Sequence, residues 1–585
     1  MKQRAYNLMK RWCDKLLTYE IRLPDPNVDS GLICPACHVI HGRFADLVYP
    51  LATLWAKTGD DRYISAAERY IDFTERNLRR SDGSYRNDLG NDWRGITAFS
   101  AMAIGDTLLE FGGRLPEALR EKWTGIFERL SDFTLRYFDT FTPNINYYAG
   151  ASAELALAYK LLGKPEYLDK ANHWEKFCRG RFDENGLFYG EIHGIDFVSE
   201  RGCRGIDMGY DLEESLPLLL RHAVLTEDGG KLAFYKARLL DHFEFLLPDG
   251  AIDNSFGTRQ NKWTYWGSRT SDGLLEGLAL VLDEPVFARA AERVLSLWEK
   301  CTSDDLLSMP MSEDAGEPTC LHHSFCHAKA LAALVNSETM IADGSEALLP
   351  LESAKGIKAF QNGNLLTVSV GGWRATFSSI DIACYRGSDN SGGSMTLLWN
   401  ERTGPVCAST MDSYIPSEPL NMQYLRRAES SPCMTPHLMI NGRRTVTDKT
   451  AKLSQDGRRI TASGDGWSSG DDGSSRNDWS SRDDWSVVYD FTPDSLGITV
   501  KAKKAKFVLP IICDKKTPAA LAAFGERLTV GSLTVESDKP LRADVAKRVF
   551  NQVGGFEYIP LEADVDGELN ISVRISCKSD GKRIR

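Results

Sequence analysis

Apolar residues in roughly the first 337 positions recur every three or four residues, which is the spacing of one face of an α-helix. Some of these patterns carry charges between the apolar positions, as 61–79 and 285–301 do, which is typical of helices half exposed to water. Others, such as 94–112 and 146–162, are apolar or small on almost every side, which indicates burial all round. The predicted helices span 3–19, 43–57, 61–79, 94–112, 116–140, 146–162, 166–180, 210–225, 230–247, 270–283, 285–301 and 322–336.

Buried and half-exposed helices alternate along the chain, and short turns such as TGDDRY and LGKPEYL precede the half-exposed ones. A helix hairpin that repeats every fifty to sixty residues or so is typical of helical arrays. Six hairpins with a separate buried layer favour a closed ring over an open solenoid. We therefore expect an (α/α)6 toroid over residues 1–340, and an irregular helical domain is the alternative.

The pattern changes after about Gly356, where short β-type runs such as LLTVSV, SVVYDF and LNISVRI alternate with turn residues. Such runs predict a C-terminal antiparallel β-sandwich over residues 341–585. Within it, residues 463–485 are rich in Ser, Asp, Gly and Trp, which is typical of a solvated loop. The tryptophans of this loop are a weaker candidate for sugar contact.

Composition narrows the possible partners. A chain of 585 residues exceeds the size of a single core, in agreement with two domains. The net charge of -11 argues against general binding to nucleic acid or an anionic membrane. The N-terminal pattern is an amphipathic helix rather than a signal peptide, and the thirteen cysteines are scattered, so we expect reduced thiols and a cytoplasmic protein of undetermined oligomeric state.

Long polar and aromatic segments precede the buried helices, whereas the turns before the half-exposed helices are short. In a closed ring all six buried helices begin at the same end, so these segments should converge there on one site. The aromatic candidates for stacking on sugars are Trp93, Tyr147, Tyr148, Tyr210, Trp263, Tyr265 and Trp266. Candidates for binding hydroxyls and a carboxylate are Asn146, Arg43, Arg94, Arg259 and Lys262.

The same segments supply carboxyl groups. Hydrolysis of a glycosidic bond needs two of them, one protonated and one ionised. The candidates are Asp92, Asp207, Asp253 and Glu191, with Asp272 as a further possibility. Each Asp is equally well explained as a helix N-cap, and Glu213 and Glu214 are explained by their place in a first helical turn.

Cysteine and histidine gather at the two ends of the helical region. Cys34, Cys37, His38 and His41 precede the first buried helix, and Cys320, His322, His323, Cys326 and His327 precede or open the last one. The Cys34-x2-Cys37 spacing is zinc-like, but the usual second pair of ligands is missing. We therefore expect no metal and no other cofactor, with reduced cysteines where the ring closes and with His41, His322 or His323 binding substrate or transferring protons. A metal ion bound by this group is the alternative.

Several motifs together resemble a known family. CPACHVIHGRFADLVYPL, GNDWRGITAF, NINYYAGASAELALA, IDMGYDLEESLP and HHSFCHAKALAAL are similar to segments of glycoside hydrolase family 154 over residues 1–337. The resemblance implies a β-glucuronidase that removes terminal glucuronic acid from a glucuronide or a uronic-acid-containing oligosaccharide. A heparinase-like lyase, with Tyr148, Tyr210, Tyr265, His41 or His193 transferring protons, is the alternative. A non-catalytic glycan-binding module is a third, less favoured class.

Overall fold

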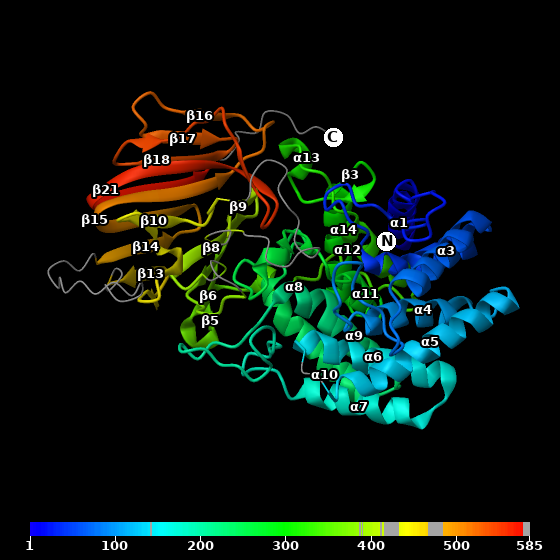
Figure 1. The fold of residues 1–585 in the computed structure, drawn as a ribbon. Helices are drawn as coiled ribbons and strands as arrows, with labels where there is room; N and C mark the ends of the chain where they lie inside the picture. The colour runs from blue at the N-terminus through cyan, green and yellow to red at the C-terminus, as the bar shows by residue number, and fades with distance from the viewer. Residues whose placement is uncertain are drawn as a thin grey trace, which may run out of the picture.

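The computed structural model describes residues 1–140, 143–384, 388, 390–409, 412, 414, 432–465 and 484–576. An N-terminal domain of helices is followed by a C-terminal domain of antiparallel β-sheets, as Figure 1 shows from the side. The predicted order of helical and β domains is therefore confirmed. Within the described residues, every helix is too short or too polar to cross a membrane.

Six helices of the N-terminal domain are buried over most of their length. Each contacts the next in chain order, and the last returns to contact the first. They are α2 (Val48–Thr58), α4 (Thr97–Phe111), α6 (Ile145–Leu162), α9 (Leu216–Leu225), α11 (Leu274–Leu278) and α14 (Leu321–Asn336).

Six amphipathic helices pack against this buried set, each with one polar face toward water. Side-chain caps fix the start of two of them: Asp60 accepts a hydrogen bond from Arg62 N at the start of α3, and Asp228 accepts one from Lys231 N at the start of α10. The six are α1 (Lys2–Leu17), α3 (Asp61–Asn77), α5 (Glu117–Tyr137), α7 (Pro165–Arg179), α10 (Gly229–His242) and α12 (Pro285–Lys300). The short helices α8 (Met208–Tyr210), α13 (Ser312–Ala315) and α15 (Pro350–Ser353) complete the set.

Two predicted helices differ from the structure. The one expected over 210–225 begins as α8, continues through a π-helical turn at Asp211–Ser215 and only then becomes α9. The one expected over 270–283 is reduced to α11, and the segment just before it forms the hairpin of β1 (Trp263–Thr264) and β2 (Gly267–Ser268). Gly273, with a φ of 105°, turns the chain into α11, a conformation that favours glycine.

The C-terminal domain contains a five-stranded sheet in the order β5-β6-β7-β8-β9 and a larger sheet built around the long pair β15 and β21. Side chains of both sheets share one apolar cluster, in which Phe377 and Tyr489 lie 4.9 Å apart between ring centroids. Of the loop predicted over 463–485, residues 466–483 lie outside the described part of the chain.

The strands of the five-stranded sheet are β5 (Gly356–Phe360), β6 (Leu365–Val370), β7 (Trp373–Ser378), β8 (Ser394–Asn400) and β9 (Gly404–Ala408). Those of the larger sheet are β10 (His437–Ile440), β11 (Arg443–Arg444), β12 (Lys452–Asp456), β13 (Arg459–Gly464), β14 (Trp485–Phe491), β15 (Ser495–Ile512), β16 (Ala519–Leu521), β17 (Arg527–Val530), β18 (Leu533–Ser537), β19 (Leu541–Arg542), β20 (Val549–Asn551) and β21 (Phe556–Ile575). A small hairpin of β3 (Thr302–Ser303) and β4 (Leu306–Leu307) belongs to the helical domain.

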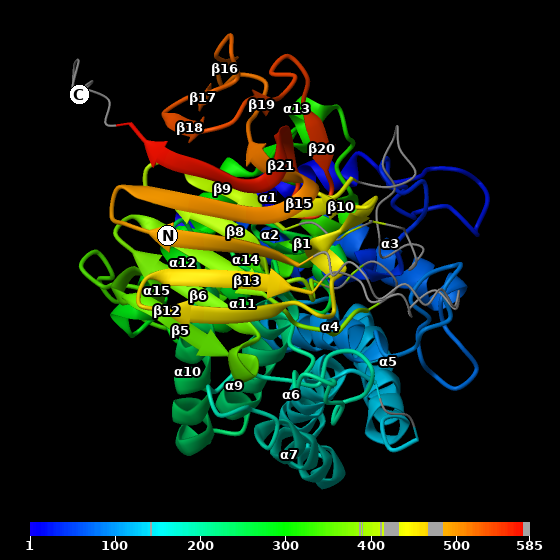
Figure 2. The same cartoon turned by 90° about the vertical axis from the view of Figure 1, so that its left-hand side faces the viewer.

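The β-domain lies against the polar segments that precede the buried helices, and Figure 2 views the molecule from the β side. Ser255 Oγ donates to Thr396 Oγ1 on β8 at 2.9 Å, and Thr264 forms a parallel bridge with Gly554. Arg201 donates to the Ser379 carbonyl at 2.6 Å. The segments that precede α8 and α11 are therefore held against the β-domain.

Candidate functional site

Tyr210 is the point at which two distant polar segments meet. Its hydroxyl oxygen lies 2.6 Å from Thr270 Oγ1 and accepts a hydrogen bond from Lys262 Nζ at 3.4 Å. The guanidinium carbon of Arg259 lies 4.4 Å from the centroid of the same phenol ring. One phenol therefore has two cations beside it, although α8 and the loop before α11 are about fifty residues apart in the chain.

The electrostatics of Tyr210 follow from this placement. Burial raises the pKa of the phenol, whereas the charges of Lys262 and Arg259 lower it. The hydroxyl is therefore protonated in the resting protein, and the two cations stabilise the phenolate that forms when it loses the proton.

Asn146 and two buried glutamates extend the group. Asn146 Nδ2 donates to Glu214 Oε1 at 2.7 Å, and its backbone N–H donates to Glu191 Oε1 at 3.3 Å. Glu191 Oε2 lies 3.6 Å from Arg259 Nε, which joins these residues to Tyr210. We call Asn146, Glu191, Tyr210, Glu214, Arg259 and Lys262 the Tyr210 cluster.

Burial changes the charge of this cluster. It raises the pKa of Glu191 to about 7, although the charge of Arg259 acts in the opposite direction. Burial also raises the pKa of Glu214, a shift that the neighbouring charge of Asp272 increases. Both glutamates therefore hold a proton at pH values at which an exposed glutamate is ionised. The charge of the cluster near neutral pH is consequently dominated by its two cations.

An aromatic pair lies beside Asn146. Trp93 Nε1 donates to Tyr147 Oη at 2.6 Å, and the two rings meet edge to face with 5.1 Å between their centroids. Both side chains are half-buried, whereas the members of the Tyr210 cluster are buried. Such a pair offers an apolar surface to a pyranose ring.

Two predicted residues lie away from the cluster. The Asp92 side chain is 65% exposed and forms an ion pair with Arg80. Arg94 donates to Asp82 at 2.7 Å and lies over the ring of Tyr137. The Asp92 carboxylate therefore faces water rather than Tyr210.

Asp207 and Asp253 bind the protein backbone. Asp207 Oδ1 accepts from Tyr210 N at 3.1 Å, and its Oδ2 accepts from Arg259 N at 2.8 Å. Asp253 accepts from Ser255 N at 3.1 Å and from the Thr376 hydroxyl of β7. Asp207 therefore positions both Tyr210 and Arg259, whereas Asp253 joins the two domains.

Trp263 and Trp266 lie in the core. Both are fully buried, and their indole N–H groups donate at 2.8 Å to the carbonyls of Ile252 and Ser308. His323 packs edge-on against Trp266, and burial lowers its pKa to about 3. These buried side chains pack beneath the loop before α11 and hold it in place.

Arg43 belongs to a buried ion network. It donates to Asp46 at 2.8 Å and to Asp272, which also binds Lys329 at 2.9 Å. Although burial alone raises the pKa of Asp272, the charges of Arg43 and Lys329 bring it below its usual value. The guanidinium is therefore engaged by carboxylates of the chain itself.

His41 and His322 lie together where the first and last buried helices meet. Their ring centroids are 5.1 Å apart, and His322 stacks on Phe325 at 4.7 Å. His41 Nε2 lies 3.6 Å from Cys320 Sγ. Burial lowers the pKa of His322, so its ring is neutral.

Other candidates for proton transfer are engaged elsewhere. Tyr265 donates to Asp249 at 2.7 Å, Tyr148 packs on Trp174, and His193 is exposed with its Nε2 2.6 Å from the Ala383 carbonyl. Tyr210 is thus the phenol among these candidates that lies beside two cations.

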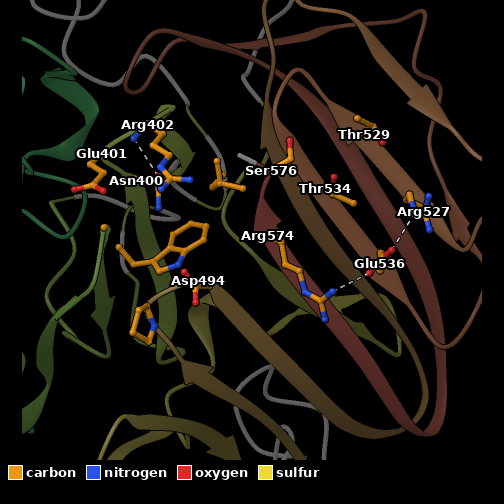
Figure 3. A pocket seen from close by; sticks show the side chains of 14 residues that line it. Asn400, Glu401, Arg402, Asp494, Arg527, Thr529, Thr534, Glu536, Arg574 and Ser576 are labelled. Carbon is orange, nitrogen blue, oxygen red and sulfur yellow. Dashed lines mark hydrogen bonds and ion pairs between the residues drawn. The ribbon is translucent and has the colours of Figure 1, made fainter. Parts of the chain in front are cut away.

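Two hollows of about 580 and 640 Å³ lie elsewhere in the molecule. The first, drawn in Figure 3, lies on the β-domain around Arg402, Arg527 and Arg574. The second lies between the domains beside Tyr265 and Trp399. Neither is lined by a residue of the Tyr210 cluster.

The sequence did not indicate two residues that lie at this site, Glu214 and Thr270. Glu214 is expected to interact with a helix dipole, but the π-helical turn directs its side chain to Asn146. The local sequence pattern does not predict a π-helical turn. Thr270, which contacts Tyr210, falls within an expected helix. The dense run of polar residues before Thr270 is the signal that could have indicated it.

Comparison with known proteins gives a consistent result over most of the chain. Residues 9–352 match the ulvan lyase N-terminal domain and residues 357–578 match the ulvan lyase C-terminal domain. A broad-specificity ulvan lyase of Formosa agariphila is 31% identical over 583 residues, which cover 95% of this chain and 90% of that protein.

Solved structures share the fold at low identity. The chondroitin AC lyase of Streptomyces coelicolor A3 matches 99% of this chain and 80% of its own, with a TM-score of 0.55 and 13% identity. A xanthan lyase of Paenibacillus matches 99% of this chain and 57% of its own, with a TM-score of 0.54 and 9% identity.

These matches correct the functional predictions. The resemblance to glycoside hydrolase family 154 is wrong, because both halves of the chain match ulvan lyase domains instead. The glycoside hydrolase and β-glucuronidase predictions that followed from it are wrong for the same reason. The matches to the ulvan lyase domains and to a relative 31% identical favour the lyase alternative.

Proposed function

This chain belongs to the ulvan lyase family, and from that membership we propose that it is a polysaccharide lyase that cleaves an acidic, uronate-containing polysaccharide of the ulvan type by β-elimination. In this reaction a base removes the proton on C5, next to the uronate carboxylate. The C5 electron pair forms a C4–C5 double bond as the bond from C4 to the glycosidic oxygen breaks. An acid then gives a proton to the departing oxygen, so that no water is consumed.

The observation that carries the chemistry is the placement of Tyr210 between Lys262 and Arg259. We assign proton transfer to the Tyr210 hydroxyl, whose phenolate form these cations stabilise. The same cations attract the uronate carboxylate and offset the negative charge that develops on it when C5 loses its proton.

Asn146 is assigned to recognition of the carboxylate. Its Oδ1 is buried without a hydrogen-bond partner among the described residues, so one end of the amide is available to a ligand. The two ends of an amide are assigned from their hydrogen bonds. A protonated Glu214 can donate to the amide oxygen and turn the NH2 toward the substrate. A neutral Glu214 also avoids repelling an anionic sugar.

Two further roles are assigned to side chains beside Tyr210. We propose that Trp93 and Tyr147 form a sugar-stacking surface and that Asp207 positions Tyr210 and Arg259, whose backbone N–H groups it accepts from.

The architecture of the two domains is also proposed. The closed sequence of contacts from α2 through α14 supports an (α/α)6 toroid over about residues 1–340. The apolar cluster shared by the two sheets supports a β-sandwich over about 341–585.

Incubation with ulvan tests the proposal. Elimination creates a double bond conjugated with the carboxylate, so the ultraviolet absorbance must rise together with the number of new chain ends. New reducing ends without that absorbance would indicate hydrolysis and refute the proposal. Chondroitin and xanthan, offered in parallel, measure how far the activity is restricted to ulvan.

A further inference from the structure

Four potential metal ligands converge where the first and last buried helices meet. Cys34, Cys37 and His41 come from the segment before α2, and Cys320 is the N-cap of α14. Their ligand atoms all lie within 4.8 Å of one another, although nearly 280 residues separate His41 from Cys320. Cys34, His41 and Cys320 are buried and Cys37 is half-buried.

From this geometry we infer that Cys34, Cys37, His41 and Cys320 form a structural zinc site. Zinc bonded tetrahedrally to sulfur at about 2.3 Å and to nitrogen at about 2.0 Å requires sulfurs about 3.8 Å apart and sulfur and nitrogen about 3.5 Å apart. The observed distances from Cys320 Sγ are 3.8 Å to Cys34 Sγ, 3.5 Å to Cys37 Sγ and 3.6 Å to His41 Nε2. These are edges of such a tetrahedron, and a disulfide needs sulfurs about 2.0 Å apart.

The local backbone also suits a metal-binding turn. Cys34 N donates to the Val39 carbonyl at 3.0 Å, and His38 N donates to the Cys34 carbonyl at 2.9 Å. His38 adopts a φ of 56°, which closes the turn and returns the chain toward His41. Two cysteines three positions apart on a tight turn are a frequent half of a zinc site, and Cys320 with His41 supplies the rest.

The ligand set indicates the role of the ion. Three thiolates and one imidazole fill all four tetrahedral positions, which leaves none for water or substrate. The ion would bind the start of the ring of buried helices to its end. A second group, Asp46, Asp272 and Cys326, is different, because Arg43 and Lys329 already neutralise its carboxylates.

Elemental analysis of the purified full chain tests the inference. We expect about one zinc per chain, and X-ray absorption at the zinc edge should show three sulfur neighbours and one nitrogen neighbour. Cobalt introduced in place of zinc should give the intense visible absorption of a tetrahedral thiolate site. Protein that lacks zinc and does not take it up after anaerobic reduction would overturn the inference, as would iron in its place or a disulfide among these cysteines.

Variants separate metal binding from general damage. Cys320→Ser should lose the zinc and lower the Tm, whereas Cys178→Ser, at a buried cysteine of α7, should keep the full zinc content. His41→Cys should retain zinc in a four-cysteine set, whereas His41→Ala should lose it. Equal zinc content in Cys320→Ser and the native protein would exclude Cys320 as a ligand and refute the site.

Discussion

Replacement of Tyr210 by phenylalanine removes one oxygen atom from the centre of the proposed site. The ring that lies under Arg259 remains, and Lys262 keeps its place in the loop before α11. Without the phenol oxygen, neither the 2.6 Å interaction with Thr270 nor the 3.4 Å hydrogen bond from Lys262 can form. The perturbation is therefore confined to the group that is assigned to proton transfer.

The size of the two effects can be worked out separately. A positioned acid or base contributes about 10²- to 10⁴-fold to the rate, which corresponds to about 3–5 kcal/mol in the barrier. Loss of a buried hydrogen bond costs about 1–3 kcal/mol of folding free energy. We therefore expect kcat to fall at least about 100-fold in Tyr210→Phe while the protein stays folded.

The assay is the initial rate of ultraviolet absorbance increase on ulvan, with circular dichroism as a check on folding. Tyr265→Phe is the matched control, because it removes a buried phenol oxygen that binds Asp249 at 2.7 Å. This control should lose stability and keep its rate. A Tyr210→Phe enzyme with a rate within about threefold of the native one would refute the role of Tyr210, since proton transfer contributes far more than that.

Four further changes test other parts of the account. Lys262→Met removes a charge that lowers the pKa of Tyr210, so the pKa governing kcat/KM should move upward in a pH–rate profile; an unchanged profile would exclude the coupling. Glu214→Gln imitates the protonated acid and should keep most of the activity near neutral pH. Glu214→Ala removes the contact with Asn146 and should lose the activity. An equal loss of activity in both variants would argue against a neutral Glu214. Asp272→Asn leaves Arg43 and Lys329 short of a partner and should cost about 3–5 kcal/mol in chemical denaturation; a cost below about 1 kcal/mol would contradict the network. Burial raises the pKa of Glu154 from 4.5 to about 8, so the free energy of unfolding should fall as pH rises between those values, and Glu154→Gln should remove that part of the fall in denaturation measured at several pH values.

Much of the fold could be predicted because burial leaves a periodic record in the sequence. The helices over 61–79 and 146–162 were predicted within about two residues, since their apolar spacing matches one helical face or complete burial. The structure of residues 263–273 could not be predicted from the local pattern. The hairpin in this segment depends on contacts with the β-domain, such as the bridge between Thr264 and Gly554. Tertiary contacts there override the local pattern.

The site shows the same division. The proximity of Asn146, Tyr210, Arg259 and Lys262 could be predicted because polar residues concentrate before buried helices, and the structure brings these four together. Their roles in catalysis and binding stay predictions. The choice between hydrolysis and elimination was wrong, because a carboxylate in a polar segment has no sequence mark that distinguishes a catalytic acid from a cap. Asp207 is such a case, since its oxygens accept hydrogen bonds from Tyr210 N and Arg259 N.

Elimination and hydrolysis differ in whether an oxygen atom from water enters the products of cleavage. Ulvan oligosaccharides are cleaved in water enriched in the heavy oxygen isotope, and the products are weighed by mass spectrometry. Elimination predicts an unsaturated fragment lighter than the hydrolytic product by one water, with no heavy oxygen incorporated during bond cleavage. Saturated fragments that carry one heavy oxygen from solvent would show that water attacks the glycosidic bond and would contradict the account.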